Sequence, residues 1–191
     1  LISFLANNLD NFFDTSFAQE IKNYTTNFSE VDDKRSENNN KDNKNDLCLR
    51  YENITKTIVI CDGVADIPTI YDFLNNSDIL KQSEEKEWLL KANILILEKG
   101  TLNINGRDIH LLKIDSDYSN NVAYSIISRG NLIIDNTNIT SWNSTKNSIP
   151  DFTTPDTPRA YIWTFWNSAG KTNISNSFLG NLGFKSHSGT T

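Results

Sequence analysis

Three ten-residue segments align on a leading glycine, and this repeat constrains the fold more than any other feature of the sequence. The segments begin at Gly100, Gly130 and Gly170, thirty and then forty residues apart. Aliphatic residues fall at two matching positions, first Ile104, Ile134 and Ile174, and then Ile109, Ile139 and Leu179. A polar pair lies between these positions in every segment: Asn105-Gly106, Asp135-Asn136 and Ser175-Asn176. Pairs of this kind suit corners at which a strand turns.

The repeat predicts a mainly β chain folded as a right-handed parallel β-helix, a solenoid of stacked coils whose inward side chains align along the axis. Unequal spacing fits this fold, because an insertion such as residues 143–158 leaves the stack on one side. An antiparallel β-sandwich is the alternative, since it also uses short strands at this spacing. The aligned glycines and aliphatic residues favour the β-helix.

Composition and charge exclude several classes of protein. The chain has 191 residues, a net charge of −6 and 37% hydrophobic residues, which suits one globular domain with or without a tail. A pI of about 4.9 argues against a general nucleic-acid-binding protein, which needs clustered Lys and Arg. The best apolar run, residues 88–97, is too short to span a membrane and contains Lys91 and Asn93.

Asparagine is unusually frequent, with about 27 residues. Asn suits turn-rich β structure because it tolerates the left-handed backbone conformation, and a biased genome composition explains the excess equally well. Seven asparagines lie in Asn-x-Ser/Thr sequons: Asn23, Asn27, Asn53, Asn75, Asn138, Asn143 and Asn173. This density indicates an exported glycoprotein, extracellular or on the cell surface.

The composition divides the chain into four parts. Residues 1–29 carry apolar side chains at three- and four-residue steps, which predicts a separate amphipathic helix over about residues 2–22 that docks on an apolar surface or lies near an anchor. Residues 30–46 are almost entirely polar or charged and predict a solvated linker. Residues 47–87 hold a hairpin and a capping helix, and residues 88–191 form the first coils of a β-helix that we expect to continue beyond 191.

Two β-prone runs on either side of residues 53–55 predict a hairpin. A register with Tyr51 opposite Ile58 brings Cys48 directly across from Cys61, and the chain has no other cysteine. We therefore predict a cross-strand disulfide, which requires an oxidising compartment. Free buried thiols and half of a metal site are the alternatives, the second weakened by the distance in sequence to both histidines.

Residues 67–76 predict a short helix that caps the first coil. Asp66 is the expected N-cap, Pro68 lies in the first turn, and Ile70, Phe73 and Leu74 face inward. No such cap follows the last repeat. A partner chain, an envelope component or further residues are therefore expected to cover the open C-terminal coil.

Several blocks of the sequence carry a family resemblance. The most specific are Thr140-Ser141-Trp142-Asn143 and Pro158-Arg159-Ala160-Tyr161, within a similarity that covers residues 47–191 or thereabouts. The chain resembles the N-terminal part of exported right-handed β-helix proteins related to mannuronan C5-epimerases. This resemblance implies a surface fold of the carbohydrate-binding and sugar-hydrolase type. It also implies a catalytic groove on later coils, around an Asp-Pro-His-Asp motif that this sequence lacks.

No catalytic set is visible in the sequence. C5 epimerisation of a uronate needs a base, an acid and a cation that neutralises the sugar carboxylate. The residues of suitable type near the later repeats are His187, Arg159, Tyr161 and Tyr124, to which we assign no catalytic role. The candidates for carbohydrate contact are Trp142, Arg159 and Trp166, with burial or a structural salt bridge as the alternative roles.

Asp115 and Asp117 alternate as the first oxygen ligands of a calcium loop do. Ile126 stands where such a loop has its bidentate Glu, so a plain Asx-rich turn is favoured and calcium is a weak candidate cofactor.

The sequence therefore predicts a secreted or surface β-helix that binds an anionic polysaccharide and, in its complete form, modifies it. The alternative is a non-enzymatic, glycosylated envelope or adhesion scaffold with the same fold.

Overall fold

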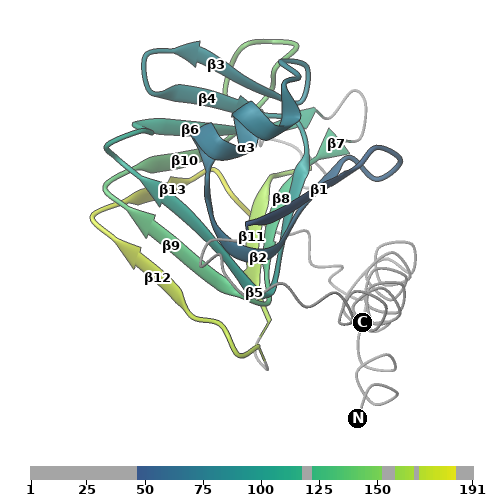
Figure 1. Ribbon diagram of the computed structural model, residues 1–191. Helices are drawn as coiled ribbons and strands as arrows, with labels where there is room; N and C mark the ends of the chain where they lie inside the picture. Colours follow the sequence, from purple (N-terminus) through teal and green to yellow (C-terminus); the bar gives the residue numbers. More distant parts are fainter. Residues whose placement is uncertain (1–46, 118–121, 152–157, 166–167, 184–191) are drawn as a thin grey trace, which may run out of the picture. The chain divides into compact units, whose positions relative to one another are not determined.

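Parallel strands wound into stacked coils make up most of the described part of the chain (Figure 1). The computed structural model describes residues 47–117, 122–151, 158–165 and 168–183. Their strands hydrogen-bond into a seven-stranded and a six-stranded sheet, in which strands of successive coils pair in parallel. The chain is thus mainly β with parallel sheets, and the antiparallel sandwich does not fit this topology.

Each full coil contributes one strand to each of three faces. The first face contains β4 (Glu87–Leu90), β6 (Leu111–Asp117), β10 (Asn138–Trp142) and β13 (Phe178–Gly180). The second contains the first halves of β2 (Thr57–Asp66) and β5 (Asn93–Asn105), followed by β8 (Ser125–Ser128) and β11 (Tyr161–Thr164). The third contains the second halves of β2 and β5, followed by β9 (Asn131–Asp135) and β12 (Thr172–Ser175).

Three short strands add antiparallel edges to this stack. These are β1 (Cys48–Glu52) on β2, β3 (Leu80–Glu84) on β4, and β7 (Val122–Ala123) on β6. Because β2 pairs in parallel with β5, strands of the stack already occur upstream of residue 88.

The repeated glycines form a column along one edge of the stack. Gly63 pairs with Gly100, and the register of the following residues aligns Gly130 and Gly170 with them. A Cβ atom on Gly130 would collide with the carbonyl oxygens of Leu97 and Gly100. Backbone atoms cannot retreat as a flexible side chain can, so this edge requires glycine.

Asparagines turn the next corner, as the polar pairs predicted. Asn136 and Asn176 have φ values of 54° and 49°, in the left-handed region that Asn tolerates. The backbone N–H of Gly106 donates to the Asp135 carbonyl, and that of Asn136 donates to the Ser175 carbonyl, which links the corners of successive coils.

Aligned aliphatic side chains fill the interior of the coils. Ile58, Ile94 and Ile126 are in register and fully buried, and Ile162 continues their column. Ile104, Ile134 and Ile174 align as predicted. In the second aligned set, Ile139 does pair with Leu179, but its partner in the preceding coil is Leu112 rather than Ile109. Ile109 lies in a turn closed by its N–H on the Asn105 carbonyl, which shifts the register by three residues.

The helix α3 (Ile67–Leu74) lies over the end of the stack that begins with β2 (Figure 1). Asp66 caps it by accepting a hydrogen bond from the Thr69 N–H at 2.8 Å, as predicted. Ile67 and Ile70 enter the core, and Tyr71 contacts the ring of Trp88 edge-on. The inward position predicted for Phe73 is wrong: this side chain is 47% exposed, because the helix buries the side that carries Ile67, Ile70 and Leu74.

The predicted hairpin and disulfide are both present. Tyr51 pairs with Ile58, and Cys48 bonds to Cys61 with 5.1 Å between their Cα atoms. The sequence predicted that the two cysteines lie directly opposite each other. They do not, because a bulge pairs Cys48 with Asp62. The disulfide therefore fixes β1 to the first coil at the irregular end of the hairpin.

At the other end of the described stack, the last coil is only half covered. Ile174 is 45% exposed, whereas Ile104 and Ile134 at the same position of the two preceding coils are fully buried. β11, β12 and β13 each pair on one side only within the described part of the chain. The amphipathic helix over about 2–22, the linker 30–46, Asn23, Asn27, Trp166 and His187 lie outside the described residues. Within the described ranges no helix has the length and apolar character that a membrane crossing requires.

Gly130→Ala should destabilise the fold by about 1–3 kcal/mol, the typical cost of forcing an extra group into a packed position. Gly183→Ala is the matched control, because its Cβ would meet only the flexible Arg159 side chain, 3.2 Å from Cδ. Urea unfolding followed by circular dichroism measures both variants. Equal midpoints for wild type and Gly130→Ala would show that the glycine column is not required.

Reduction of the Cys48–Cys61 disulfide should lower the free energy of unfolding by about 3 kcal/mol, because the bond closes a short loop in the unfolded chain. Urea midpoints with and without dithiothreitol measure this change. The double variant Cys48→Ser/Cys61→Ser is the control and should not respond to the reductant.

Candidate functional site

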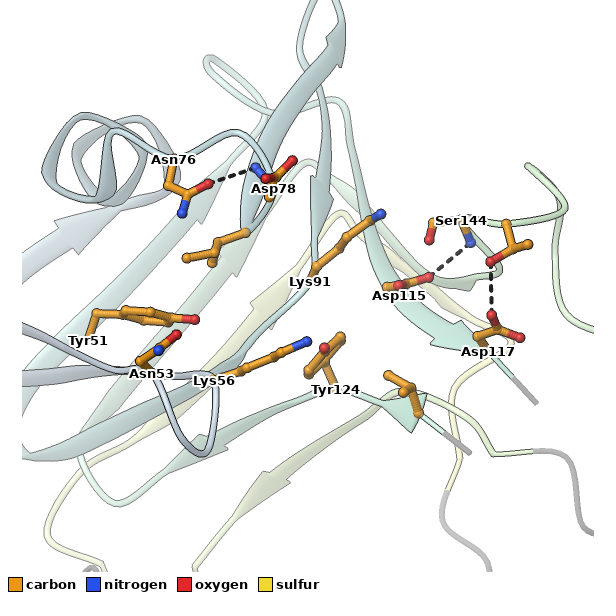
Figure 2. A pocket seen from close by; sticks show the side chains of 13 residues that line it. Tyr51, Asn53, Lys56, Asn76, Asp78, Lys91, Asp115, Asp117, Tyr124 and Ser144 are labelled. Atoms are coloured by element: carbon orange, nitrogen blue, oxygen red, sulfur yellow. Dashed lines mark hydrogen bonds between the residues drawn. The ribbon is translucent and has the colours of Figure 1, made fainter. Parts of the chain in front are cut away.

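A pocket of about 500 Å³ lies outside the corner between the first and second faces (Figure 2). Its residues come from four places far apart in the sequence: the β1–β2 hairpin, the segment before β3, the β4–β5 corner, and the region from the end of β6 to the loop after β10. The lining residues are Tyr51, Asn53, Lys56, Asn76, Asp78, Ile79, Lys91, Asp115, Asp117, Val122, Tyr124, Ser144 and Thr145.

Backbone hydrogen bonds fix the segments that line this pocket. The Asn93 N–H donates to the Lys56 carbonyl at 2.8 Å, which holds the hairpin turn against the β4–β5 corner. The Lys91 N–H donates to the Ile79 carbonyl at 2.7 Å, and the Tyr124 N–H donates to the Asp115 carbonyl at 3.1 Å. The pocket is therefore largely formed before any ligand arrives.

The acidic side of the pocket is made by Asp115 and Asp117, both buried at the end of β6. Asp115 Oδ1 accepts a hydrogen bond from the Ser144 N–H at 2.9 Å. Asp117 accepts from Asn143 Nδ2 at 3.3 Å and from the Thr145 hydroxyl at 2.9 Å. These bonds hold the loop after β10, so the two carboxylates anchor residues 143–145. The Asx-rich turn favoured from the sequence falls partly on residues 118–121, which lie outside the described ranges.

The fit of a calcium ion to this anchor is poor. Calcium takes six to eight oxygen ligands, and several oxygens of Asp115 and Asp117 already accept hydrogen bonds from the loop. The described residues contain no group of three or more side chains of the His, Cys, Asp and Glu types arranged to hold a metal. We derive no chemistry through a metal here.

Two lysines and two tyrosines make the other side of the pocket. Figure 2 shows Lys56 extending toward Tyr124, and Lys91 on the side nearest Asp115. Within the described part of the chain neither lysine has a salt bridge, whereas Lys113 binds Glu87 at 2.7 Å and Arg129 binds Glu98 at 2.8 Å. Two ammonium groups thus face the pocket and its solvent.

Burial raises the pKa of the Tyr51 phenol above its ordinary value, and the nearby Lys56 ammonium offsets part of this rise. Tyr51 is therefore a neutral hydrogen-bond donor at physiological pH and not a base. Tyr124 is 9% exposed and also lines this pocket.

Asp115, Asp117 and Tyr124 line this pocket, whereas Trp142 and Arg159, the described candidates for carbohydrate contact, do not. Trp142 pairs with Asp115 across β10 and β6, and the Lys113 ammonium covers one face of its ring at 4.5 Å from the centroid. Arg159 precedes β11, where the Ala160 N–H donates to the buried Ser141 hydroxyl at 2.9 Å. Along β11, Ile162 faces the core while Trp163 packs on Phe165 with ring centroids 4.3 Å apart.

Sequence reasoning missed Lys56, Lys91 and Tyr51 as site residues. No motif joins them, because the fold brings them together from positions separated by the whole first coil. Tyr124 alone among the pocket residues had been considered for sugar chemistry. The sequence offered only an indirect signal for this site, namely that Lys56 and Lys91 each lie shortly before a strand at the same corner of two successive coils.

The described sequons differ in exposure. Asn53, Asn75 and Asn173 are exposed, Asn138 is half-buried, and Asn143 is 4% exposed with its Nδ2 bonded to Asp117. A glycan attaches at Nδ2, so the folded protein offers the first three as acceptors more readily than Asn143.

Comparison with known proteins shows that the chain has the fold of a β-helix protein and is a distant relative of the mannuronan C5-epimerases. It is 24% identical over 136 residues to the mannuronan C5-epimerase of Pseudomonas syringae pv. tomato (strain ATCC BAA-871 / DC3000), which is 71% of this chain and 24% of the epimerase. No protein-family model matches the chain.

Among solved structures, the crystal structure of the periplasmic alginate epimerase AlgG superposes with a TM-score of 0.58 at 23% identity. The alignment covers 68% of this chain and 30% of AlgG, and the D317A mutant of AlgG gives the same values. The chain thus spans about a quarter of the curated relative's length, and the likeness to AlgG establishes the fold alone.

Expression in a host that glycosylates sequons should give glycans at Asn53, Asn75 and Asn173 and an unmodified Asn143 in the folded fraction. Peptide mass spectrometry after glycosidase treatment in heavy-oxygen water measures the occupancy of each sequon. A folded protein modified at Asn143 would contradict the hydrogen bond that we describe between this amide and Asp117.

Proposed function

We propose that the protein is exported and binds an anionic polysaccharide built from uronate units. The observation that carries this proposal is the relationship to a mannuronan C5-epimerase over 71% of the chain. Lys56 and Lys91 at the corner pocket support it, since neither forms a salt bridge with another described residue and a polyuronate presents a carboxylate on every sugar.

Two features support export. The Cys48–Cys61 disulfide needs an oxidising compartment, and the structural relative AlgG is a periplasmic alginate epimerase. The sequons extend this proposal to an extracellular or cell-surface glycoprotein. In the same proposal one surface protein has four separate parts. These are the amphipathic helix of residues 1–29, the linker 30–46, the hairpin and cap of residues 47–87, and the coils of 88–191.

We further infer that the coils are right-handed, because parallel crossover connections are right-handed in nearly all proteins. The half-covered edge around Ile174 supports a cover there, which we propose to be another chain, an envelope component or further residues of the protein itself.

For carbohydrate contact we propose Trp142, Arg159 and Trp166. The support for Trp142 is its place on β10 beside Asp115, with an aromatic ring that is only half-buried and that the Lys113 ammonium covers on one face. The support for Arg159 is its place next to Ala160, whose backbone N–H is held by the Ser141 hydroxyl just before β11.

A non-enzymatic envelope or adhesion scaffold is the second candidate, and a specific observation favours it over epimerisation by these residues. The sequence lacks the Asp-Pro-His-Asp motif that the family resemblance leads us to expect. Binding and catalysis therefore need separate tests.

Binding is tested by affinity electrophoresis and calorimetry with polymannuronate and, as the neutral comparison, dextran. We expect retention by polymannuronate that weakens as salt rises, because salt screens ammonium–carboxylate attraction. Trp142→Ala should weaken this binding severalfold, whereas Phe73→Ala, an exposed aromatic on α3, should not. Equal mobility in both polymers would support the scaffold instead.

Epimerisation is tested separately by incubating the protein with polymannuronate in deuterium oxide. Inversion at C5 by proton exchange would place deuterium at that carbon, which proton NMR detects. We expect no incorporation by these 191 residues. Deuterium at C5 would show a catalytic set that neither the motif nor the pocket accounts for.

A further inference from the structure

We propose that the corner pocket is a binding site for a single uronate unit, held by Lys56 and Lys91 through its carboxylate and by Asp115 and Asp78 through its hydroxyl groups. The inference rests on the proposed polysaccharide binding and names the subsite and its chemistry. It concerns the first coils, whereas the family resemblance points to a groove on later ones.

Size is the first argument. A cavity of about 500 Å³ lies within the range of small-ligand pockets, from roughly 300 to 1,000 Å³, and accommodates one or two sugar rings. The rim is made of the hairpin turn at Asn53, the segment at Asn76 and Asp78, and the loop at Thr145.

Charge is the second argument. The pocket carries two ammonium groups and three carboxylates, those of Asp78, Asp115 and Asp117. A ligand that carries several negative charges and no hydroxyl donors, such as a polyphosphate, would meet these carboxylates unfavourably. A neutral sugar would leave both lysines without a partner. A uronate satisfies both sets, since it has one carboxylate and several hydroxyl groups that donate to acidic side chains.

The neutral groups give the third argument. Tyr51 stays protonated, so its hydroxyl can donate to a ring or carboxylate oxygen, and the two tyrosine rings add apolar surface for the C–H groups of a sugar. Asn53 and Asn76 add amides at the rim. This mixture of donors, acceptors and aromatic surface is typical of sites that bind hydroxylated ligands.

Continuity with the outer face completes the argument. Asp115 lines the pocket and pairs directly with Trp142 on the neighbouring strand, about 5 Å away by the spacing of paired strands. A chain anchored by one uronate in the pocket therefore continues across Trp142 on the outer side of β10. The pocket then fixes the register of the polysaccharide along the first face.

Calorimetry with oligomannuronates of two to four units tests the pocket. Lys91→Gln should reduce affinity about tenfold, because it removes a charge-assisted contact while keeping a polar, flexible side chain only one atom shorter. Lys56→Gln, at a more exposed position, should reduce it less, and the double variant should lose binding. Lys81→Gln, an exposed lysine on β3, is the matched control and should bind as wild type does.

Thermal unfolding of every variant controls for misfolding, and the midpoint temperature of each variant should equal that of the wild type. If polymannuronate binds wild type and both pocket variants equally, the pocket inference fails while the proposed function stands. If inorganic phosphate or sulfate displaces the oligosaccharide at equal concentration, the site binds anions in general and the uronate inference is overturned.

A last measurement separates this inference from the proposed function. Saturation-transfer NMR with free glucuronate and, for comparison, glucose reports binding of a single unit without any polymer. Transfer to glucuronate that disappears in Lys91→Gln supports the pocket even where polymer binding is absent. No transfer to either sugar, with polymer binding intact, assigns the polymer to another surface.

Discussion

The described stack of coils depends on the close approach of one coil to the next along the glycine column. Gly100, Gly130 and Gly170 each lie against a carbonyl oxygen of the preceding coil, where no Cβ atom fits. That approach keeps successive strands in hydrogen-bonding register and aligns Ile58, Ile94 and Ile126 into a continuous buried column. Each such isoleucine contributes about 1.5–3 kcal/mol by leaving water, which the stack retains only while the register holds.

Polar side chains buried in this apolar stack mark the places where loops are attached. Ser116 and Ser141 are fully buried, and they bond to the Pro158 carbonyl and the Ala160 N–H at the end of the long loop after β10. A buried polar group without a partner is costly, so Ser116 and Ser141 each favour one conformation of that loop. The half-buried Asn93 at the β4–β5 corner accepts from the Ser125 N–H and hydroxyl at 3.0 Å each, which links β5 to the start of β8.

Much of the fold could be predicted from the sequence, because its determinants are periodic. The glycines, the corner asparagines, the hairpin register at Tyr51 and the cap at Asp66 all recur at fixed offsets or follow local rules. The errors have local causes that no pattern reports: a turn after Asn105 that delays the next strand, a bulge at Cys48, and a helix that exposes Phe73. The pocket escaped prediction for the opposite reason. Its residues share no spacing, and only the winding of the chain brings Lys56 beside Tyr124.

The chemistry of the pocket explains why it suits binding better than proton transfer. Removal of the C5 proton of a uronate needs a base with a free lone pair close to the sugar. Asp115 and Asp117 instead use oxygens to hold the loop at residues 143–145, and burial keeps the Tyr51 phenol protonated. The lysines supply the cation that neutralises a sugar carboxylate, one of the three requirements of epimerisation. In the pose that we propose, Asp78 and Asp115 accept hydrogen bonds from sugar hydroxyl groups rather than the C5 proton, so the site holds a uronate without changing it. Recognition and catalysis can therefore reside on different coils of one stack, the first coils supplying register and any chemistry being supplied elsewhere.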